Sequence, residues 1–236
     1  MTSRRLNFTL SYMNISGVGR QPVAGRVAAL RLDREGQARL LRLATAFSRA
    51  CNFVVAIARQ HGCFSRVALH HLAYRPLREA QPELGAQMAC NAIHAVCRAC
   101  IAVYLHPDYP WNPRLPEPAP LPHIAFSARA PVYFDQHTLS LRGTRASLYT
   151  LEGRLHCELQ LSAGLQQRLG AERLVQTLLM ATDQGFVLEF CFEADVPARP
   201  RNRPRPAASE GAALARHLQI VLPPERPPAT ALGPAA

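Results

Sequence analysis

The prolines restrict the fold of this chain more than any other feature of its sequence. Seven of the 20 prolines lie within residues 106–122 (HPDYPWNPRLPEPAPLP), and nine more lie at or after Pro197. Proline lacks the amide hydrogen and fixes φ, so neither stretch can form a regular helix or a central strand. We therefore expect an extended connector over residues 106–123 and a disordered tail over residues 197–236.

The block before the connector predicts a strand followed by helices. Residues 27–32 (VAALRL) form a short apolar run that is typical of a strand. Residues 34–60 then carry apolar side chains at helical spacing, and Gly62 is expected to end that helix. Two further helices are predicted over residues 66–79 and 84–105, so this block forms a helical lobe.

The block after the connector predicts short antiparallel strands. Leu188, Phe190 and Phe192 alternate with Glu189, Cys191 and Glu193, which is the period of a half-buried strand. Glu152-Gly153 and residues 183–185 (DQG) predict hairpin turns. The fold class is therefore expected to be α+β, a small antiparallel β-barrel with an inserted helical lobe. The predicted segments are an N-terminal arm with the first barrel strand (1–33), the helical lobe (34–105), the connector (106–123), the rest of the barrel (124–196) and the tail (197–236).

The charge of the chain indicates an acidic partner. All 27 basic residues are arginine, and the formal net charge is +11. Residues 26–104 hold 11 arginines against four acids, whereas residues 105–196 hold seven arginines against ten acids. We expect nucleic acid to be the partner and the helical block to make most phosphate contacts. An arginine-only set suits bidentate phosphate contacts, and a codon bias explains it equally well.

Other classes of protein and site are not expected. No run of about 18 apolar residues predicts a membrane span, and the N-terminus lacks the apolar core of a secretory signal. Seven scattered cysteines favour a reduced, cytoplasmic protein over a disulfide scaffold. The one Cys-x-x-Cys motif, Cys97 to Cys100, falls within a single predicted helix, so we expect no metal site and no cofactor.

Three arginines on one face of the first helix are candidate phosphate ligands. These are Arg39, Arg42 and Arg49. One interpretation is an ordinary solvated helix face, and the other is contact with nucleic-acid phosphates. Few acids are expected on that face to pair with the three arginines, which favours phosphate contact.

A polar stripe on the third helix is the second candidate site. Glutamine and asparagine side chains can bind adenine edges, and arginine can bind guanine. The stripe consists of Gln87, Asn91, His94 and Arg98.

Four segments, in this order, resemble TnpB-type proteins, the OrfB family of insertion sequences. They are residues 30–58, 82–104, 132–162 and 178–197. In that family this region is a wedge β-barrel with an inserted recognition lobe, a plan shared with type V CRISPR effectors, and it binds a guide RNA and reads a short DNA motif. The resemblance implies roles in nucleic-acid binding for Arg49 and Asn52 in the first helix, for Phe64 and Arg66 before and in the second helix, and for the stripe on the third. For Phe64, packing in the core is an equally good interpretation.

The sequence departs from the family where its RuvC-like nuclease would begin. Metal-dependent phosphodiester cleavage needs several convergent carboxylates. All five aspartates lie at or before Asp195, and only Glu210 and Glu225 follow Val196. We therefore expect a transposon-associated protein that binds guide-type RNA and duplex DNA without cleaving them, and no enzymatic activity from this chain alone. The alternatives are a truncated non-functional fragment, a protein–protein adaptor, or one subunit of a split nuclease whose catalytic domain is a separate chain.

Overall fold

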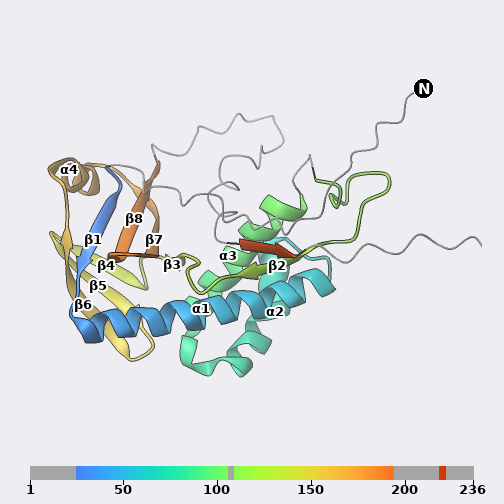
Figure 1. Cartoon of the computed structure of the whole chain (residues 1–236), viewed down its shortest axis with the longest axis horizontal. Helices are drawn as coiled ribbons and strands as arrows, with labels where there is room; N and C mark the ends of the chain where they lie inside the picture. Colours follow the sequence, from blue (N-terminus) through green and yellow to red (C-terminus); the bar gives the residue numbers. More distant parts are fainter. Residues whose placement is uncertain (1–24, 106–108, 194–217, 222–236) are drawn as a thin grey trace, which may run out of the picture.

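The protein is an α+β fold with a nearly closed seven-strand antiparallel barrel at one end and a helical lobe at the other (Figure 1). The computed structural model describes residues 25–105, 109–193 and 218–221. The predicted fold class is confirmed. The elements are β1 (Val27–Arg31), α1 (Arg34–Gln60), α2 (Arg66–Ala80), the 3-10 turn η1 (Pro82–Leu84), α3 (Ala86–Tyr104), β2 (His123–Phe126), β3 (Val132–Phe134), β4 (Leu139–Arg142), β5 (Arg145–Thr150), β6 (Gly153–Gln160), α4 (Ala163–Ala171), β7 (Leu174–Thr182), β8 (Gly185–Phe192) and β9 (Leu218–Val221).

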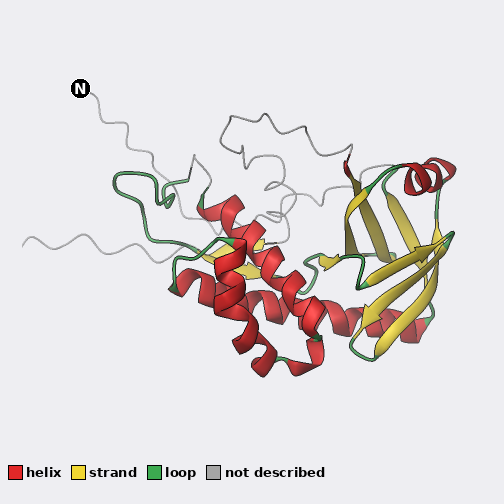
Figure 2. Ribbon diagram, turned by 180° about the vertical axis from the view of Figure 1, so that it is seen from behind, coloured by secondary structure: helices red, strands yellow, loops and turns green. Residues whose placement is uncertain are grey.

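The barrel strands follow the order β3-β7-β8-β1-β6-β5-β4. The first strand of the chain therefore lies in the middle of the sheet, where it pairs with β6 on one side and β8 on the other (labelled in Figure 1; Figure 2 shows the barrel from behind). Leu188, Phe190 and Phe192 of β8 are buried. This agrees with the apolar half of the alternation seen in the sequence, because every second side chain of a strand faces the same side of the sheet. Glu189, which lies between two of them, is also buried, so the strand is covered on both faces at that point.

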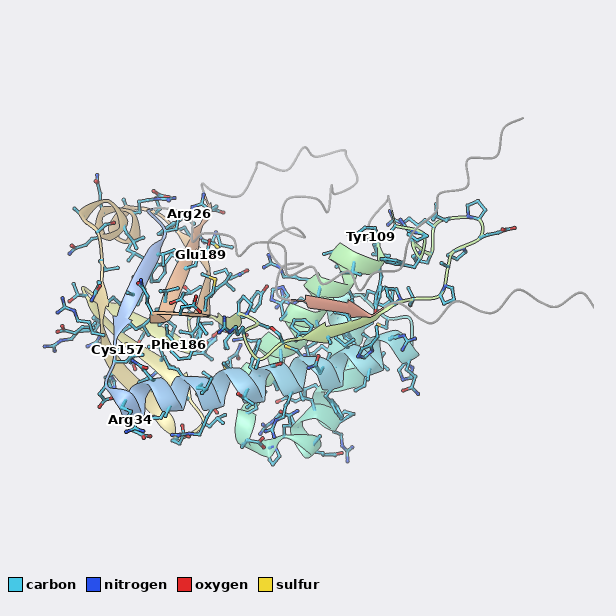
Figure 3. All side chains as sticks on the ribbon, in the orientation of Figure 1. Arg26, Arg34, Tyr109, Cys157, Phe186 and Glu189 are labelled. Atoms are coloured by element: carbon cyan, nitrogen blue, oxygen red, sulfur yellow. The ribbon has the colours of Figure 1, made fainter. Side chains whose placement is uncertain are left out.

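Helix α1 connects the two halves of the molecule. Its N-terminus is capped by Asp33, whose side chain accepts a hydrogen bond from the Gly36 amide at 2.7 Å. At 27 residues the helix is about 40 Å long. It begins beneath the barrel, where Figure 3 labels Arg34, and runs into the lobe, whose far end lies near Tyr109. One helix thus presents its first turns to the barrel and its last turns to α2 and α3.

A single apolar core runs through both halves. Leu69 of α2 and Met88, Ala92 and Val96 of α3 are buried in the lobe. Phe47 of α1 stacks on Tyr133 of β3, with ring centroids 6.5 Å apart, which joins the lobe to the barrel. By length and composition, α1 and α3 would each suffice to cross a membrane, but most of each apolar window is buried within this core.

Three segments differ from the sequence-based expectation. Residues 218–221, within the predicted disordered tail, form β9 and pair with β2; this run (LQIV) contains no proline, and three of its four residues are apolar. Helix α4 was not predicted. Instead of extending as a simple connector, the described part of residues 106–123 turns back on α3, where the Trp111 indole donates to the Val103 carbonyl at 2.8 Å. The arginines at 199–205 lie outside the described residues.

Candidate nucleic-acid interface

The first two arginines of the α1 face lie against the turn between β5 and β6. Arg39 Nη2 donates to Thr150 Oγ1 at 2.7 Å and to the Gly153 carbonyl at 3.1 Å. Arg42 Nε donates to Glu152 Oε1 at 2.6 Å, and its Nη2 donates to Glu35 at 2.9 Å. These arginines therefore attach the hairpin turn to the helix.

The expectation that few acids would pair with this face is wrong. Glu152 reaches it from a turn that lies 110 residues further along the chain than Arg42. Arg39 Nε lies 3.7 Å from the other Glu152 oxygen, too far for a hydrogen bond. Burial raises the pKa of Glu152, but the hydrogen bond and charge of Arg42, together with hydrogen bonds from the backbone and Thr150, outweigh the effect of burial, so the pKa lies below its ordinary value. The hydrogen bond to Glu152 likewise raises the pKa of Arg42.

The second half of α1 places its candidate residues against other elements. Arg49 pairs with Glu83 of η1 at 2.9 Å, in an exposed position. Asn52 makes two hydrogen bonds with the backbone of Phe126 in β2: its Oδ1 accepts from the amide at 2.7 Å, and its Nδ2 donates to the carbonyl at 3.0 Å. In this arrangement both the oxygen and the nitrogen of the Asn52 amide bind the backbone of β2, which gives this side chain a structural role.

The polar stripe of α3 faces the barrel. Asn91 is buried and donates to the Tyr133 carbonyl of β3 at 3.1 Å. Gln87 donates to Asp135, and Arg98 donates to Gln176 of β7 while its guanidinium lies 5.7 Å from the centre of the Tyr133 ring. The half-buried His94 belongs to the same stripe. The predicted stripe exists, but it contacts β3 and β7, so its polar edges are engaged at the seam between lobe and barrel.

The loop between β3 and β4 contacts the polar stripe of α3 through Asp135. Asp135 accepts hydrogen bonds from the His137 amide at 2.9 Å and from the Thr138 amide and hydroxyl at 3.0 Å, as well as from Gln87. Burial raises the pKa of Asp135, but these hydrogen bonds outweigh it and the pKa lies below its ordinary value. The loop is thereby held against the N-terminal half of α3.

Phe64 and Arg66, the candidates before and at the start of α2, lie in different surroundings. The ring of Phe64 packs on Tyr104 with centroids 5.0 Å apart, and its carbonyl accepts from the Cys97 thiol at 2.9 Å. Arg66 is exposed at the first residue of α2. Of the predicted residues, Arg66 is therefore the one whose side chain projects into solvent with no ion pair in the described part of the chain.

The arginines without a carboxylate partner include three on the barrel. Within the described residues, Arg142, Arg145 and Arg154 form no ion pair, although the sequence block that holds them is acidic overall. The sequence Arg142-Gly143-Thr144-Arg145 could have predicted this arginine pair. A two-residue turn places the two arginines directly opposite each other on β4 and β5.

The described cysteines do not gather with the described acids and histidines into a metal-binding cluster. No group of three or more His, Cys, Asp or Glu side chains in the described residues is arranged to bind a metal ion. Cys97 and Cys100 are buried in α3, and burial raises the pKa of the Cys100 thiol well above its ordinary value. These thiols pack as small apolar groups in the lobe core.

Comparison with known proteins yields no relative: no family model matches the chain, and no curated protein matches its sequence.

Proposed function

We propose that this chain is a nucleic-acid-binding protein of the TnpB-like type that binds guide-type RNA and duplex DNA without cleaving either. One observation carries the proposal: a small barrel interrupted after its first strand by an arginine-rich helical lobe. The order of these parts is the one that the sequence resemblance implies. The net charge of +11 supports the same class of partner, because phosphate neutralisation by clustered arginines drives such binding.

The proposal of binding without cleavage has separate support. Two-metal phosphodiester hydrolysis requires carboxylates that converge on the ions. Among the described residues, Glu152, Glu83 and Glu35 are paired with arginines, and no acidic cluster forms. These three glutamates neutralise arginines instead of converging on a common point.

A salt titration tests the proposal. The purified chain is titrated into fluorescently labelled single-stranded RNA and duplex DNA of the same sequence, at NaCl concentrations from about 50 to 400 mM, with polarisation as the readout. We expect dissociation constants in the nanomolar to micromolar range that weaken steeply with salt. An absence of binding at about 50 mM salt would refute the proposal. Cleavage of either labelled strand in the presence of Mg²⁺ would overturn the non-enzymatic part.

A protein–protein adaptor is the second candidate function. It is favoured by three exposed apolar side chains of the lobe: Leu41 on α1 is 55% exposed, and Val67 and Leu72 on α2 are 68% and 38% exposed. A separate nuclease subunit is one partner that such a surface would accept. Size-exclusion chromatography with light scattering distinguishes the two candidates, because an adaptor is expected to oligomerise or capture a partner without affinity for nucleic acid.

A further inference from the structure

A row of charged side chains crosses four neighbouring strands of the barrel. Backbone register aligns Arg142 of β4 with Arg145 of β5, Arg145 with Glu158 of β6, and Glu158 with Arg31 of β1. All four side chains are exposed. Neighbouring strands lie about 4.8 Å apart, so the row is about 14 Å long. It carries three positive charges and one negative charge.

The charges in this row are not balanced within the fold. Glu158 pairs with Arg31 at 3.9 Å, and both side chains are more than half exposed. Arg142 and Arg145 face each other directly and have no ion pair in the described residues, an arrangement that destabilises a sheet. By contrast, Arg129 pairs with Asp183 and Arg173 with Glu193 elsewhere on the barrel. An anion from outside the fold would relieve the repulsion between Arg142 and Arg145.

A fourth arginine extends the positive surface along the strands. Arg154 of β6 donates to the hydroxyl of Ser147 at 2.8 Å, to the Ser147 carbonyl at 2.9 Å and to the His137 carbonyl at 3.3 Å. These acceptors are neutral, so they orient the guanidinium without cancelling its charge. A charge oriented in advance loses less entropy when a ligand binds.

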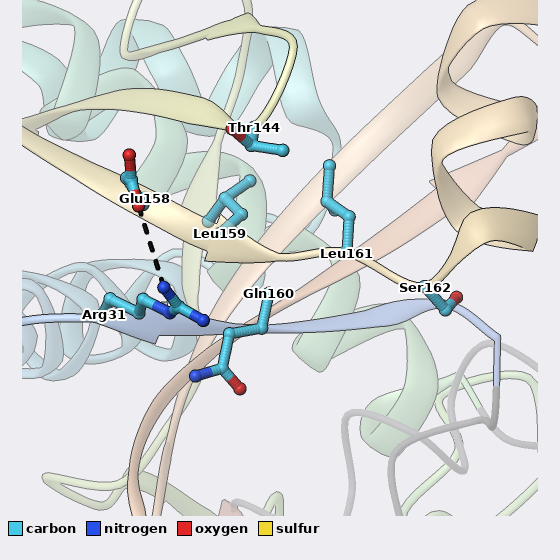
Figure 4. Close-up of a pocket in the computed structure, with 7 residues that line it drawn as sticks. All are labelled: Arg31, Thr144, Glu158, Leu159, Gln160, Leu161 and Ser162. Carbon is cyan, nitrogen blue, oxygen red and sulfur yellow. Dashed lines mark ion pairs between the residues drawn. The ribbon is translucent and has the colours of Figure 1, made fainter.

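The surface beside the row is hollowed. A hollow of about 490 Å³ is lined by Arg31 and Glu158 together with Thr144, Gln160 and Ser162, as Figure 4 shows. A second hollow of about 560 Å³ shares Arg31 and Glu158 and extends to Arg145 and His156. The two hollows meet at the Arg31–Glu158 pair. A ligand that follows them would pass between the arginines and several hydroxyl and amide groups.

We propose that this outer face of β4, β5, β6 and β1 binds the phosphate backbone of a single RNA strand, with Arg142 and Arg145 as phosphate ligands. This inference rests on the proposed function and places the main contact between the protein and RNA on the barrel. Glu158 favours RNA over DNA as the occupant. A carboxylate repels phosphate but accepts a hydrogen bond from a ribose 2′-hydroxyl, which DNA lacks. Among the residues that line the hollows, the only aromatic ring is the imidazole of His156, and no Phe, Tyr or Trp is present, so contact with the backbone is expected to dominate.

The test compares two charge-matched double variants. Arg142→Gln/Arg145→Gln removes the proposed ligands, and Arg129→Gln/Arg173→Gln removes two exposed arginines that are paired with acids. Each phosphate contact to a single strand contributes about 0.7 to the slope of log affinity against log salt. Loss of two contacts therefore lowers the slope by about 1.4, so the affinity ratio of wild type to variant falls about sevenfold between 50 and 200 mM salt. The control variant is expected to keep the wild-type slope.

The outcomes separate this inference from the proposed function. If the wild-type chain binds no RNA, the proposed function itself fails. If it binds RNA and both double variants keep its slope, the proposed function stands and the barrel site is wrong. A urea titration supplies a second readout: relief of like-charge repulsion predicts that Arg142→Gln/Arg145→Gln unfolds at the same or a higher urea concentration, and a lower midpoint would refute the premise of unbalanced charge.

The choice of RNA is tested on the same titration. Single-stranded DNA of identical sequence should bind the wild type about fivefold more weakly, because the loss of one net hydrogen bond lowers the affinity by about that factor. Glu158→Gln keeps an acceptor and removes the repulsion, so it should narrow the difference between RNA and DNA. Equal affinity of the wild type for both strands would overturn RNA as the preferred occupant.

Discussion

Gly85 at the start of α3 offers a quantitative test of the contact between the helical lobe and the barrel. Its backbone has φ 77° and ψ 155°, a region that is essentially restricted to glycine. A Cβ added there would lie 2.5 Å from the Tyr149 hydroxyl, which donates to the Leu84 carbonyl at 3.0 Å. Gly85→Ala should therefore strain the backbone and displace the ring that joins β5 to η1.

The expected cost can be estimated from these two effects. The backbone conformation contributes about 2 kcal/mol. Loss of the hydrogen bond from Tyr149 contributes about 1 kcal/mol, which gives a total of about 3 kcal/mol. Gly62→Ala is the matched control, because Gly62 also has a positive φ, of 56°, but no atom lies within 4 Å of the added Cβ. It should cost about 1 kcal/mol.

Urea unfolding followed by circular dichroism measures the free energy of unfolding of both variants. Tyr149→Phe removes the hydroxyl that the new Cβ would meet, so Gly85→Ala should cost about 1 kcal/mol less in that background than in the wild type. The reasoning is refuted if Gly85→Ala costs no more than Gly62→Ala. It is also refuted if Tyr149→Phe leaves the cost of Gly85→Ala unchanged.

Three further predictions concern other parts of the fold. Asn52→Ala should lower the free energy of unfolding by about 2 kcal/mol, because two hydrogen bonds to Phe126 are lost, and should change RNA affinity by less than about twofold; a loss of affinity at unchanged stability would contradict the structural role. The pKa values of Asp135 and Glu152 lie below their ordinary values in the folded state. Their stabilisation is therefore present above the unfolded pKa of about 4 and lost as the pH falls through the folded pKa. Urea midpoints at pH 7, 4 and 3 should show this loss, and Asp135→Asn should reduce it. Burial raises the pKa of Cys157 to about 11, so its alkylation at pH 8 should be about a hundredfold slower than in the urea-unfolded chain, and equal rates measured by mass spectrometry would argue against burial of this thiol.

The elements of the fold could be predicted because their signals are local. Asp33 before the first helix, Gly62 after it and the alternation in β8 each involve residues close together in the chain, and the structure has each element where its signal lies. Helix α4 was missed because only Leu165 of that helix is buried, so it has no apolar stripe that periodicity would reveal.

The pairing of charges could not be predicted, because it depends on contacts between distant residues. A count of charges by block assigned free arginines to the helices, yet Arg42 is paired by Glu152 from the barrel and Arg49 by Glu83 from η1. Periodicity likewise identified the polar stripe of α3 without showing that β3 would pack on it. Whether Arg66 or the α3 stripe contacts nucleic acid stays a prediction.

The position of β1 has a consequence for the order in which the protein folds. Ala29 of β1 pairs with Gln160 on one side and Val187 on the other, so this strand leaves the ribosome long before either neighbour exists. The intervening lobe contains the local contacts of three helices and can form first, whereas the barrel must close across a large separation in sequence. We therefore expect α1 to α3 to gain protection from hydrogen exchange early in refolding, and β1 to gain it later, together with its partners β6 and β8.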